Sequence, residues 1–220
     1  MFRYRIANVC LALICGRPSH AARNILTIQT RGPYRNGQHS RGQVLLAATV
    51  VFAEHGYAAG SLRKIAEQAA MTEPGVLRLF GSKEGLLLAV LEYWRPKLEL
   101  VDDGGRNGLA SLRRSAVKFA SNHDLDEARR LFTVISVEAH SRFHPARSFV
   151  LEWNASRLGA VTTALATASA NGEIRPLTNT QVARKAALTI ALIDGLGIQR
   201  LINPDAEVVT LYEAYVSTLL

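Results

Sequence analysis

Histidine and carboxylate side chains gather between residues 138 and 144, where their types could bind a metal ion. His140 and His144 are four residues apart, with Glu138 close by. On one continuous helix both imidazoles would face the same way, as the ligands of a zinc site can. Pro145 instead predicts that a new helix begins at His144, which separates the two rings. The sequence therefore favours a capping residue and an ordinary histidine, and we expect no metal site.

Catalytic signatures are absent from the chain. It contains no Gly-x-Ser-x-Gly elbow, no Gly-x-x-x-x-Gly-Lys loop, no His-Glu-x-x-His and no Gly-x-Gly-x-x-Gly. We therefore expect no catalytic residue and no cofactor, and the protein is not expected to be an enzyme.

Cationic and small side chains between residues 61 and 83 have the types that bind nucleic acid. Arg63 and Lys64 lie near the start of a short predicted helix, where they can reach phosphates. A second short helix follows, and base edges are read by side chains on the exposed side of such a helix. We expect that side to carry Glu73, Gly75, Val76 and Arg78.

The helices that position these side chains begin at recognisable N-cap residues. Ser61 precedes a helix over 62–70, and Thr72 precedes one that runs to Phe80. We also expect Ser61 and Thr72 among the DNA-binding residues. Glu73 and Pro74 suit the first turn of the second helix. Two short helices joined by a tight turn are typical of a helix-turn-helix, in which the first braces across the backbone and the second enters the major groove. An ordinary helical hairpin has the same spacing.

Other capping residues and helix-ending residues also predict helices. One helix starts at Gln43 and ends near Gly56, and Ser82 caps another that Pro96 should kink or end. Beyond the turn-rich stretch 102–108, the periodicity predicts helices over 109–122, 128–141, 144–170, 182–201 and 203–220. Asp124 with Glu127, and Thr178 with Gln181, form capping boxes before two of them. The predicted fold is all-α.

Charge is unevenly distributed along the 220 residues. Residues 1–53 contain seven arginines and no acidic residue, whereas the rest carries 19 basic and 18 acidic residues. A basic end on a nearly neutral body indicates a polyanion partner at that end, and nucleic acid is favoured over an anionic membrane. Residues 1–40 lack sustained periodicity, so we expect a basic, flexible tail.

Composition limits the class and the compartment. The chain is 48% hydrophobic and 20% charged, as globular proteins are. No apolar run approaches the ~18 residues of a membrane span. Cys10 and Cys15 are too few for a disulfide framework. We expect a cytoplasmic protein without a membrane partner.

The segment 41–94 resembles the DNA-binding domain of tetracycline-repressor (TetR) type regulators. The residues that carry the resemblance are Ala48, Phe52, Gly56, Ser61, Ile65, Ala66, Ala69, Phe80, Ser82, Lys83, Glu84 and Leu86. The carboxyl half resembles the family's ligand-binding and dimerisation domain more loosely, through Glu138-Ala139, His144-Pro145, residues 172–176 and residues 194–196. The resemblance covers about residues 40–220.

The resemblance implies three segments: the tail 1–40, a three-helix helix-turn-helix DNA-binding domain over 41–101, and a larger helical ligand-binding and dimerisation domain over 102–220. Lys83 resembles the family's phosphate-binding lysine. The frequent recognition-helix tyrosine is replaced by Leu77, and the frequent turn glycine by Ala70, which is tolerable if that residue stays helical.

The resemblance also implies a sequence-specific transcription regulator, expected to be a repressor released by a small ligand. Its homodimer, formed through the last two helices, would bind a roughly palindromic operator in double-stranded DNA. Candidate interface residues are Ala187, Ile190, Ala191, Asp194, Ile198, Val208, Leu211, Tyr212, Tyr215, Val216 and Leu219. An apolar or aromatic ligand would contact Phe119, Phe132, Phe143, Phe149 and Trp153, unless these side chains form plain core.

Two other classes of protein remain open. One is a helical enzyme or ligand carrier that keeps the fold without specific DNA binding, which the missing tyrosine makes conceivable. The other is a membrane-surface protein that uses the Arg-rich amino terminus.

Overall fold

A computed structural model describes residues 33–99, 103–121 and 125–219, apart from the side chains of 33–38, 116 and 119–121. Within these ranges the chain forms helices and no strand, as the sequence predicts. The helices are α1 (Pro33–Ala59), α2 (Leu62–Gln68), α3 (Glu73–Phe80), α4 (Lys83–Leu98), α5 (Leu109–Ser121), α6 (Asp126–Glu138), α7 (Arg147–Ala170), α8 (Asn179–Ile202) and α9 (Val208–Ser217). None of the described helices is long and apolar enough to span a bilayer.

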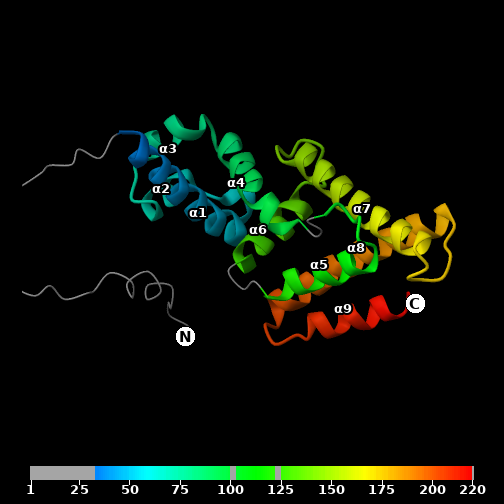
Figure 1. Ribbon diagram of the computed structural model, residues 1–220. Coiled ribbons are helices and arrows are strands. Elements are labelled where there is room, and N and C mark those ends of the chain that lie inside the picture. The colour runs from blue at the N-terminus through cyan, green and yellow to red at the C-terminus, as the bar shows by residue number, and fades with distance from the viewer. Residues whose placement is uncertain (1–32, 100–102, 122–124, 220) are drawn as a thin grey trace, which may run out of the picture. The chain divides into compact units, whose positions relative to one another are not determined.

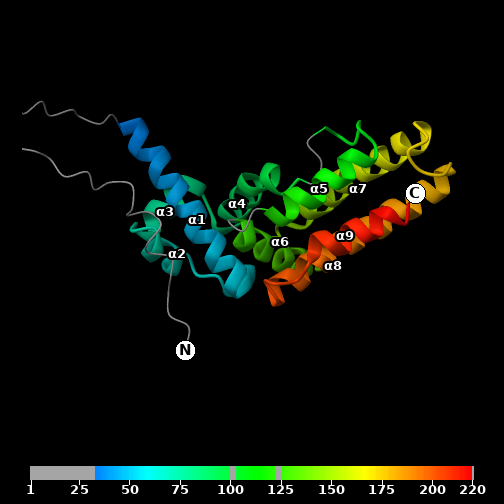
Figure 2. The same ribbon diagram turned by 60° about the horizontal axis from the view of Figure 1, so that its bottom comes forward.

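Two hydrophobic clusters hold these helices together. The first joins α1–α4 to α6 and to the start of α7, and includes Phe52, Leu87, Phe132 and Trp153. The second joins α5, α7, α8 and α9. In Figures 1 and 2, α1–α4 lie together and α6 lies between them and the other helices. The first cluster therefore contains residues from both sides of the domain boundary that the sequence predicts between residues 101 and 102.

Local capping places the first helices where the sequence predicts them. The hydroxyl oxygens of Ser61, Thr72 and Ser82 accept hydrogen bonds from the backbone N–H groups of Lys64, Gly75 and Gly85, respectively. The Thr178–Gln181 capping box is also confirmed at the start of α8. These bonds satisfy N–H groups that a helix start leaves without an acceptor.

Other helix boundaries differ from the predictions. α1 begins at Pro33 instead of Gln43, so residues 33–40 of the expected tail are helical. The rest of that tail, and Asp124, lie outside the described residues. The N-cap of α6 is Leu125, without a side-chain hydrogen bond, in place of the expected Asp124–Glu127 box. α9 begins at Val208 and not at Asn203-Pro204, because residues 204 and 205 form a turn.

Ala70 adopts a backbone conformation that the sequence did not predict. Its φ is 50°, in the left-handed region, whereas an alanine is free of strain only with the right-handed helical backbone that was expected. The turn between α2 and α3 requires this geometry, because the N–H of Met71 returns to the carbonyl of Ala66 at 2.8 Å. A Cβ in this region costs roughly 1–2 kcal/mol, which glycine would avoid.

We expect Ala70→Gly to raise the free energy of unfolding by about 1 kcal/mol, because relief of the strain exceeds the entropy cost of glycine. Ala70 is exposed, so the lost methyl group removes little burial. Urea unfolding measures the change. Ala183→Gly, at an exposed position inside α8, is the matched control and should lower stability by about 0.5–1 kcal/mol. Equal losses in both variants would contradict the strain at Ala70.

Candidate DNA interface and ligand cavity

The predicted recognition helix α3 is anchored by one side chain and exposes others. Val76, expected on the exposed side, is fully buried in the first cluster, so it belongs to the core and cannot contact DNA directly. Glu73 and Arg78 are exposed, and Gly75 is partly exposed. No hydrogen bond or ion pair holds Arg78 among the described residues, which leaves its guanidinium available to a partner.

Both cations of α2 make contacts within the chain. Arg63 is exposed and pairs with Glu67 one turn later, with Nε and Oε1 3.0 Å apart. The Lys64 ammonium contacts the His55 ring and lies 3.7 Å from Glu54 Oε2. Surface pairs of this kind contribute little stability, so a phosphate can replace the carboxylate at small cost.

Lys83, at the start of α4, is bound to the end of α1. Its Nζ donates to the carbonyl of Ala58 at 3.0 Å and lies 4.8 Å from the centroid of the Tyr57 ring. Burial lowers the pKa of Lys83, and the Glu138 carboxylate opposes that shift. Lys83 therefore joins two helices, in addition to the phosphate contact that the resemblance implies.

Arg41 is a cation of this surface to which the sequence analysis assigned no site role. Its Nη1 donates to the carbonyl of Leu79 at 3.2 Å, and its guanidinium lies 4.4 Å from the centroid of the Phe80 ring. Arg41 therefore brings positive charge to the carboxyl end of α3, where it also complements the helix dipole. Its only sequence signal is its place as the last of the seven amino-terminal arginines.

A junction links α1 to α6 through Glu138. Gly56 interrupts α1 with φ 73° and ψ 177°, and the following N–H, of Tyr57, donates to Glu138 Oε2 at 2.8 Å. A Cβ on Gly56 would lie 2.0 Å from Glu138 Oε1, so another residue would be strained at this φ and would also displace the Glu138 carboxylate. His144 packs edge-on against Tyr57, with its Nε2 3.5 Å from Glu138 Oε2.

Glu138 and His144, together with His140, are the residues whose types could bind a metal ion. His140 is exposed and its Nδ1 contacts the carbonyl of Val137, apart from the Glu138–His144 pair. No group of three possible metal ligands occurs within the described part of the chain.

A cavity of about 260 Å³ lies among the ends and sides of five helices, α4 to α8. Phe132 and Trp153 line it, as the sequence suggested, and their rings pack with centroids 4.6 Å apart. Phe149 does not line the cavity, because it is packed in the first cluster behind Phe132. Phe143 is 83% exposed in the loop before α7, so its expected ligand contact is wrong. The side chain of Phe119 lies outside the described residues.

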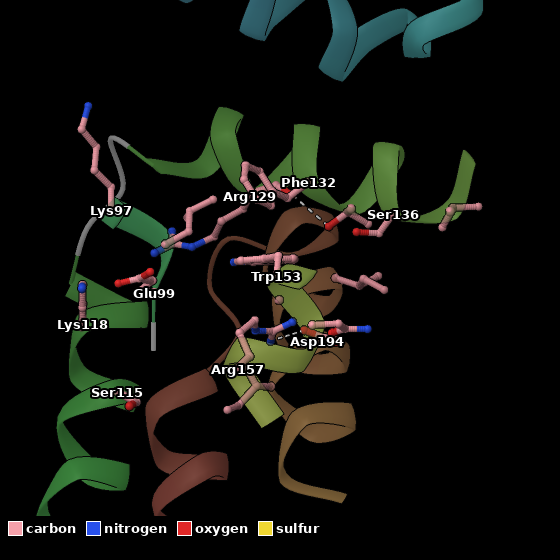
Figure 3. Close-up of a pocket in the computed structure, with 17 residues that line it drawn as sticks. Lys97, Glu99, Ser115, Lys118, Arg129, Phe132, Ser136, Trp153, Arg157 and Asp194 are labelled. Carbon is pink, nitrogen blue, oxygen red and sulfur yellow. Dashed lines mark hydrogen bonds and ion pairs between the residues drawn. The ribbon is translucent and has the colours of Figure 1, made fainter. Parts of the chain in front are cut away.

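Polar residues also line this cavity (Figure 3), a feature that the aromatic pattern did not predict. Arg157 is buried, and its Nη2 donates to Asp194 Oδ1 at 2.5 Å. Its guanidinium lies 4.6 Å from the centroid of the Trp153 ring. A buried arginine requires such a partner, because an isolated charge is costly to bury.

The face expected to form a dimer divides into buried and exposed parts. Ile190, Val208, Tyr212, Val216 and Leu219 are buried in the subunit's own second cluster, so these side chains belong to the core of the subunit and not to its exposed face. α8 instead exposes a stripe whose members are spaced alternately three and four residues apart. This stripe consists of Leu188, Ala191, Gly195, Ile198 and Ile202, and Leu211 and Ala214 are exposed on α9.

Comparison with known proteins supports this description. Residues 44–90 match the model of bacterial regulatory proteins of the tetR family. The HTH-type transcriptional activator FasR of Mycolicibacterium smegmatis is 44% identical over 52 residues, about a quarter of each chain. The match therefore spans only 24% of that relative's length.

Solved structures share the fold over most of the chain. A TetR regulator from Chloroflexus aurantiacus is 24% identical with a TM-score of 0.67, and covers 84% of this chain and 95% of its own. A putative TetR-family regulator from Rhodococcus sp. is 20% identical with a TM-score of 0.65, covering 83% and 98%. FadR from Bacillus subtilis, in complex with stearoyl-CoA, is 21% identical with a TM-score of 0.63, covering 81% and 96%.

Residues 44–90, within α1–α4, therefore carry a helix-turn-helix segment that matches the tetR family. The described chain as a whole shares the fold of the TetR-family structures.

Removal of the junction acceptor should destabilise the protein. We expect Glu138→Ala to lower the free energy of unfolding by about 1–3 kcal/mol, because the part-buried N–H of Tyr57 loses its acceptor. Glu138→Gln keeps an acceptor oxygen and should lose less. Urea unfolding compares both with Glu152→Ala, an exposed glutamate of α7. A Glu138→Ala loss no larger than that control would contradict the role of this bond.

Proposed function

We propose that the protein is a DNA-binding transcription regulator whose DNA affinity responds to a small ligand, and that it acts as a repressor which the ligand releases. The observation that carries the proposal is α3 itself, which is anchored by Val76 and exposes Glu73 and Arg78. A recognition helix needs a buried anchor and an exposed face of this kind. FasR is named an activator, so an experiment must determine whether this protein represses or activates transcription.

Two classes of DNA contact follow from the exposed cations. Arg78 projects from α3, where a guanidinium can bind a guanine edge. Arg63 projects from α2, which braces across the phosphates. Arg41 and Lys83 add positive charge beside the same two helices. Base contacts specify the sequence, whereas phosphate contacts position the protein.

Substitution of the two arginines should separate these roles. Against an operator obtained by in vitro selection, we expect Arg78→Ala to lose about 1–3 kcal/mol of discrimination over random DNA. Arg63→Ala should weaken both DNAs alike and reduce the salt slope by about 1. Fluorescence anisotropy over a range of salt measures both effects. If Arg78→Ala weakened binding to operator and random DNA equally, as Arg63→Ala should, Arg78 would not contact bases. Selection that enriches no motif would contradict the function itself.

A ligand in the cavity has two physical routes to α3. α4 runs from Lys83, bonded to Ala58, to Leu98, which lines the cavity. α6 lines it with Phe132 and ends at Glu138, which holds Tyr57. A ligand that favours one placement of α4 or α6 would therefore shift the population of DNA-competent states.

The ligand of this protein is proposed to be smaller than the stearoyl-CoA in the FadR complex. Its cavity, about 260 Å³, lies just below the roughly 300–1,000 Å³ typical of sites for drug-sized ligands. A compact molecule fits this space.

A second copy of the chain is the proposed partner of the exposed α8 stripe. Alternating steps of three and four residues form a continuous seam on a helix, and such seams pair in helical bundles. Leu188, Ile202 and Leu211 are each more than half exposed on this face. A two-fold dimer would also place two recognition helices about one DNA turn apart, as a palindromic operator requires.

Charge in this seam should prevent the dimer. We expect Leu188→Glu to convert a dimer into a folded monomer, because two carboxylates would be desolvated near the two-fold axis. Light scattering after size exclusion gives the mass, and circular dichroism checks folding. Leu151→Glu, at a similarly exposed leucine of α7, should remain dimeric. A monomeric wild type, or an unchanged dimer in Leu188→Glu, would contradict this interface.

A further inference from the structure

Two residues that line the cavity each carry a buried hydrogen-bond donor without an acceptor among the described residues. Trp153 Nε1 and Arg157 Nε belong to side chains that are 9% and 5% exposed, and neither nitrogen has a hydrogen-bond partner within 33–99, 103–121 and 125–219. Both residues line the cavity. Almost all buried polar groups in proteins are bonded, so a buried donor without an acceptor at a cavity calls for one from outside the chain.

The two donors lie close together. Trp153 and Arg157 are one helical turn apart on α7, and the guanidinium lies 4.6 Å from the centroid of the indole. Asp194 holds Arg157 through Nη2, which fixes the guanidinium without using Nε. Figure 3 shows Trp153 next to Arg157, with Asp194 beside the Arg157 guanidinium. The two side chains are therefore direct neighbours at the cavity.

The chemistry of the lining specifies that acceptor. Indole N–H and guanidinium N–H groups donate only, so the ligand must supply oxygen acceptors. Basic residues of the lining, Lys97, Lys118, Arg129 and Arg157, outnumber the acidic residues Glu99 and Asp194. This balance favours an anionic group, and bonds from such donors to a carboxylate are stronger than bonds to a neutral oxygen.

The rest of the wall is apolar and the space is small. Leu98, Phe132, Val137, Ile193 and Ile198 provide hydrocarbon surface around the two donors. We propose that the cavity binds a compact organic carboxylate, which accepts hydrogen bonds from Trp153 and Arg157 and packs its hydrocarbon part against Phe132 and the aliphatic wall. This assignment rests on the proposed function, since it names the ligand class of the same effector site.

Matched acids and esters test the charge requirement. Benzoate, phenylacetate, 1-naphthoate and octanoate, each beside its methyl ester, are titrated into the full-length protein by calorimetry. At least one acid should bind, and should bind at least about tenfold more tightly than its ester, which keeps oxygen acceptors but has no charge. No binding by any of the four acids, or equal binding by acid and ester, would overturn the proposal.

Substitutions then test the two donors. Trp153→Phe removes the N–H and keeps an aromatic ring, so it should weaken the acid about tenfold and the ester less, because a bond to a charged oxygen is the stronger one. Arg157→Lys keeps the charge but loses the planar guanidinium, and should also weaken the acid selectively. Phe132→Leu, the matched apolar control, should weaken acid and ester alike. An acid affinity that Trp153→Phe leaves unchanged would overturn the assignment, whether or not Arg157→Lys folds.

Operator binding separates this inference from the proposed function. These titrations contain no DNA, so they measure the cavity alone. If an acid binds selectively but leaves operator affinity unchanged, the ligand class stands and the ligand response fails. If the operator is bound specifically but esters bind as well as acids, the DNA-binding function stands and the carboxylate assignment fails.

Discussion

The interruption of α1 at Gly56 imposes a constraint on which the surrounding structure depends. A left-handed residue breaks the helical hydrogen bonding, and the N–H of Tyr57 then needs an acceptor in a partly buried place. Glu138 supplies it from the last turn of α6, while Lys83 binds the carbonyl of Ala58 from the first turn of α4. Two charged side chains thus connect three helices through backbone groups, and a shift of one helix must be accommodated by the others.

The hydrophobic packing extends this connection. Phe132 contacts Phe149 and Trp153 inside a cluster that also contains the core of α1–α4. Phe132 and Trp153 line the cavity as well, so the cavity wall and the support of the helix-turn-helix share side chains. Close-packed interiors move between discrete arrangements more readily than they deform gradually. A protein built this way needs no separate hinge between its cavity and α3.

Local chemistry made much of the fold predictable from the sequence. Ser61, Thr72, Ser82 and Thr178 cap helices through bonds to residues only three positions away, so the pattern carries the information itself. The short helices between these caps, with their spacing, also carry the resemblance to the TetR DNA-binding domain. Exposure of Glu73 and Arg78 followed from the same local periodicity.

Residues whose roles depend on distant partners were not predictable in this way. Val76 is buried, and Phe149 lies behind the cavity wall, because each meets a helix remote in sequence. The buried donor of Trp153 also depends on how neighbouring helices pack. The sequence by itself determined the helix order, the caps and the family of the DNA-binding region, since these rest on contacts within a few residues. Only the tertiary structure decided which side chains line the cavity and which face of α8 is exposed, because a helical stripe does not specify what it packs against.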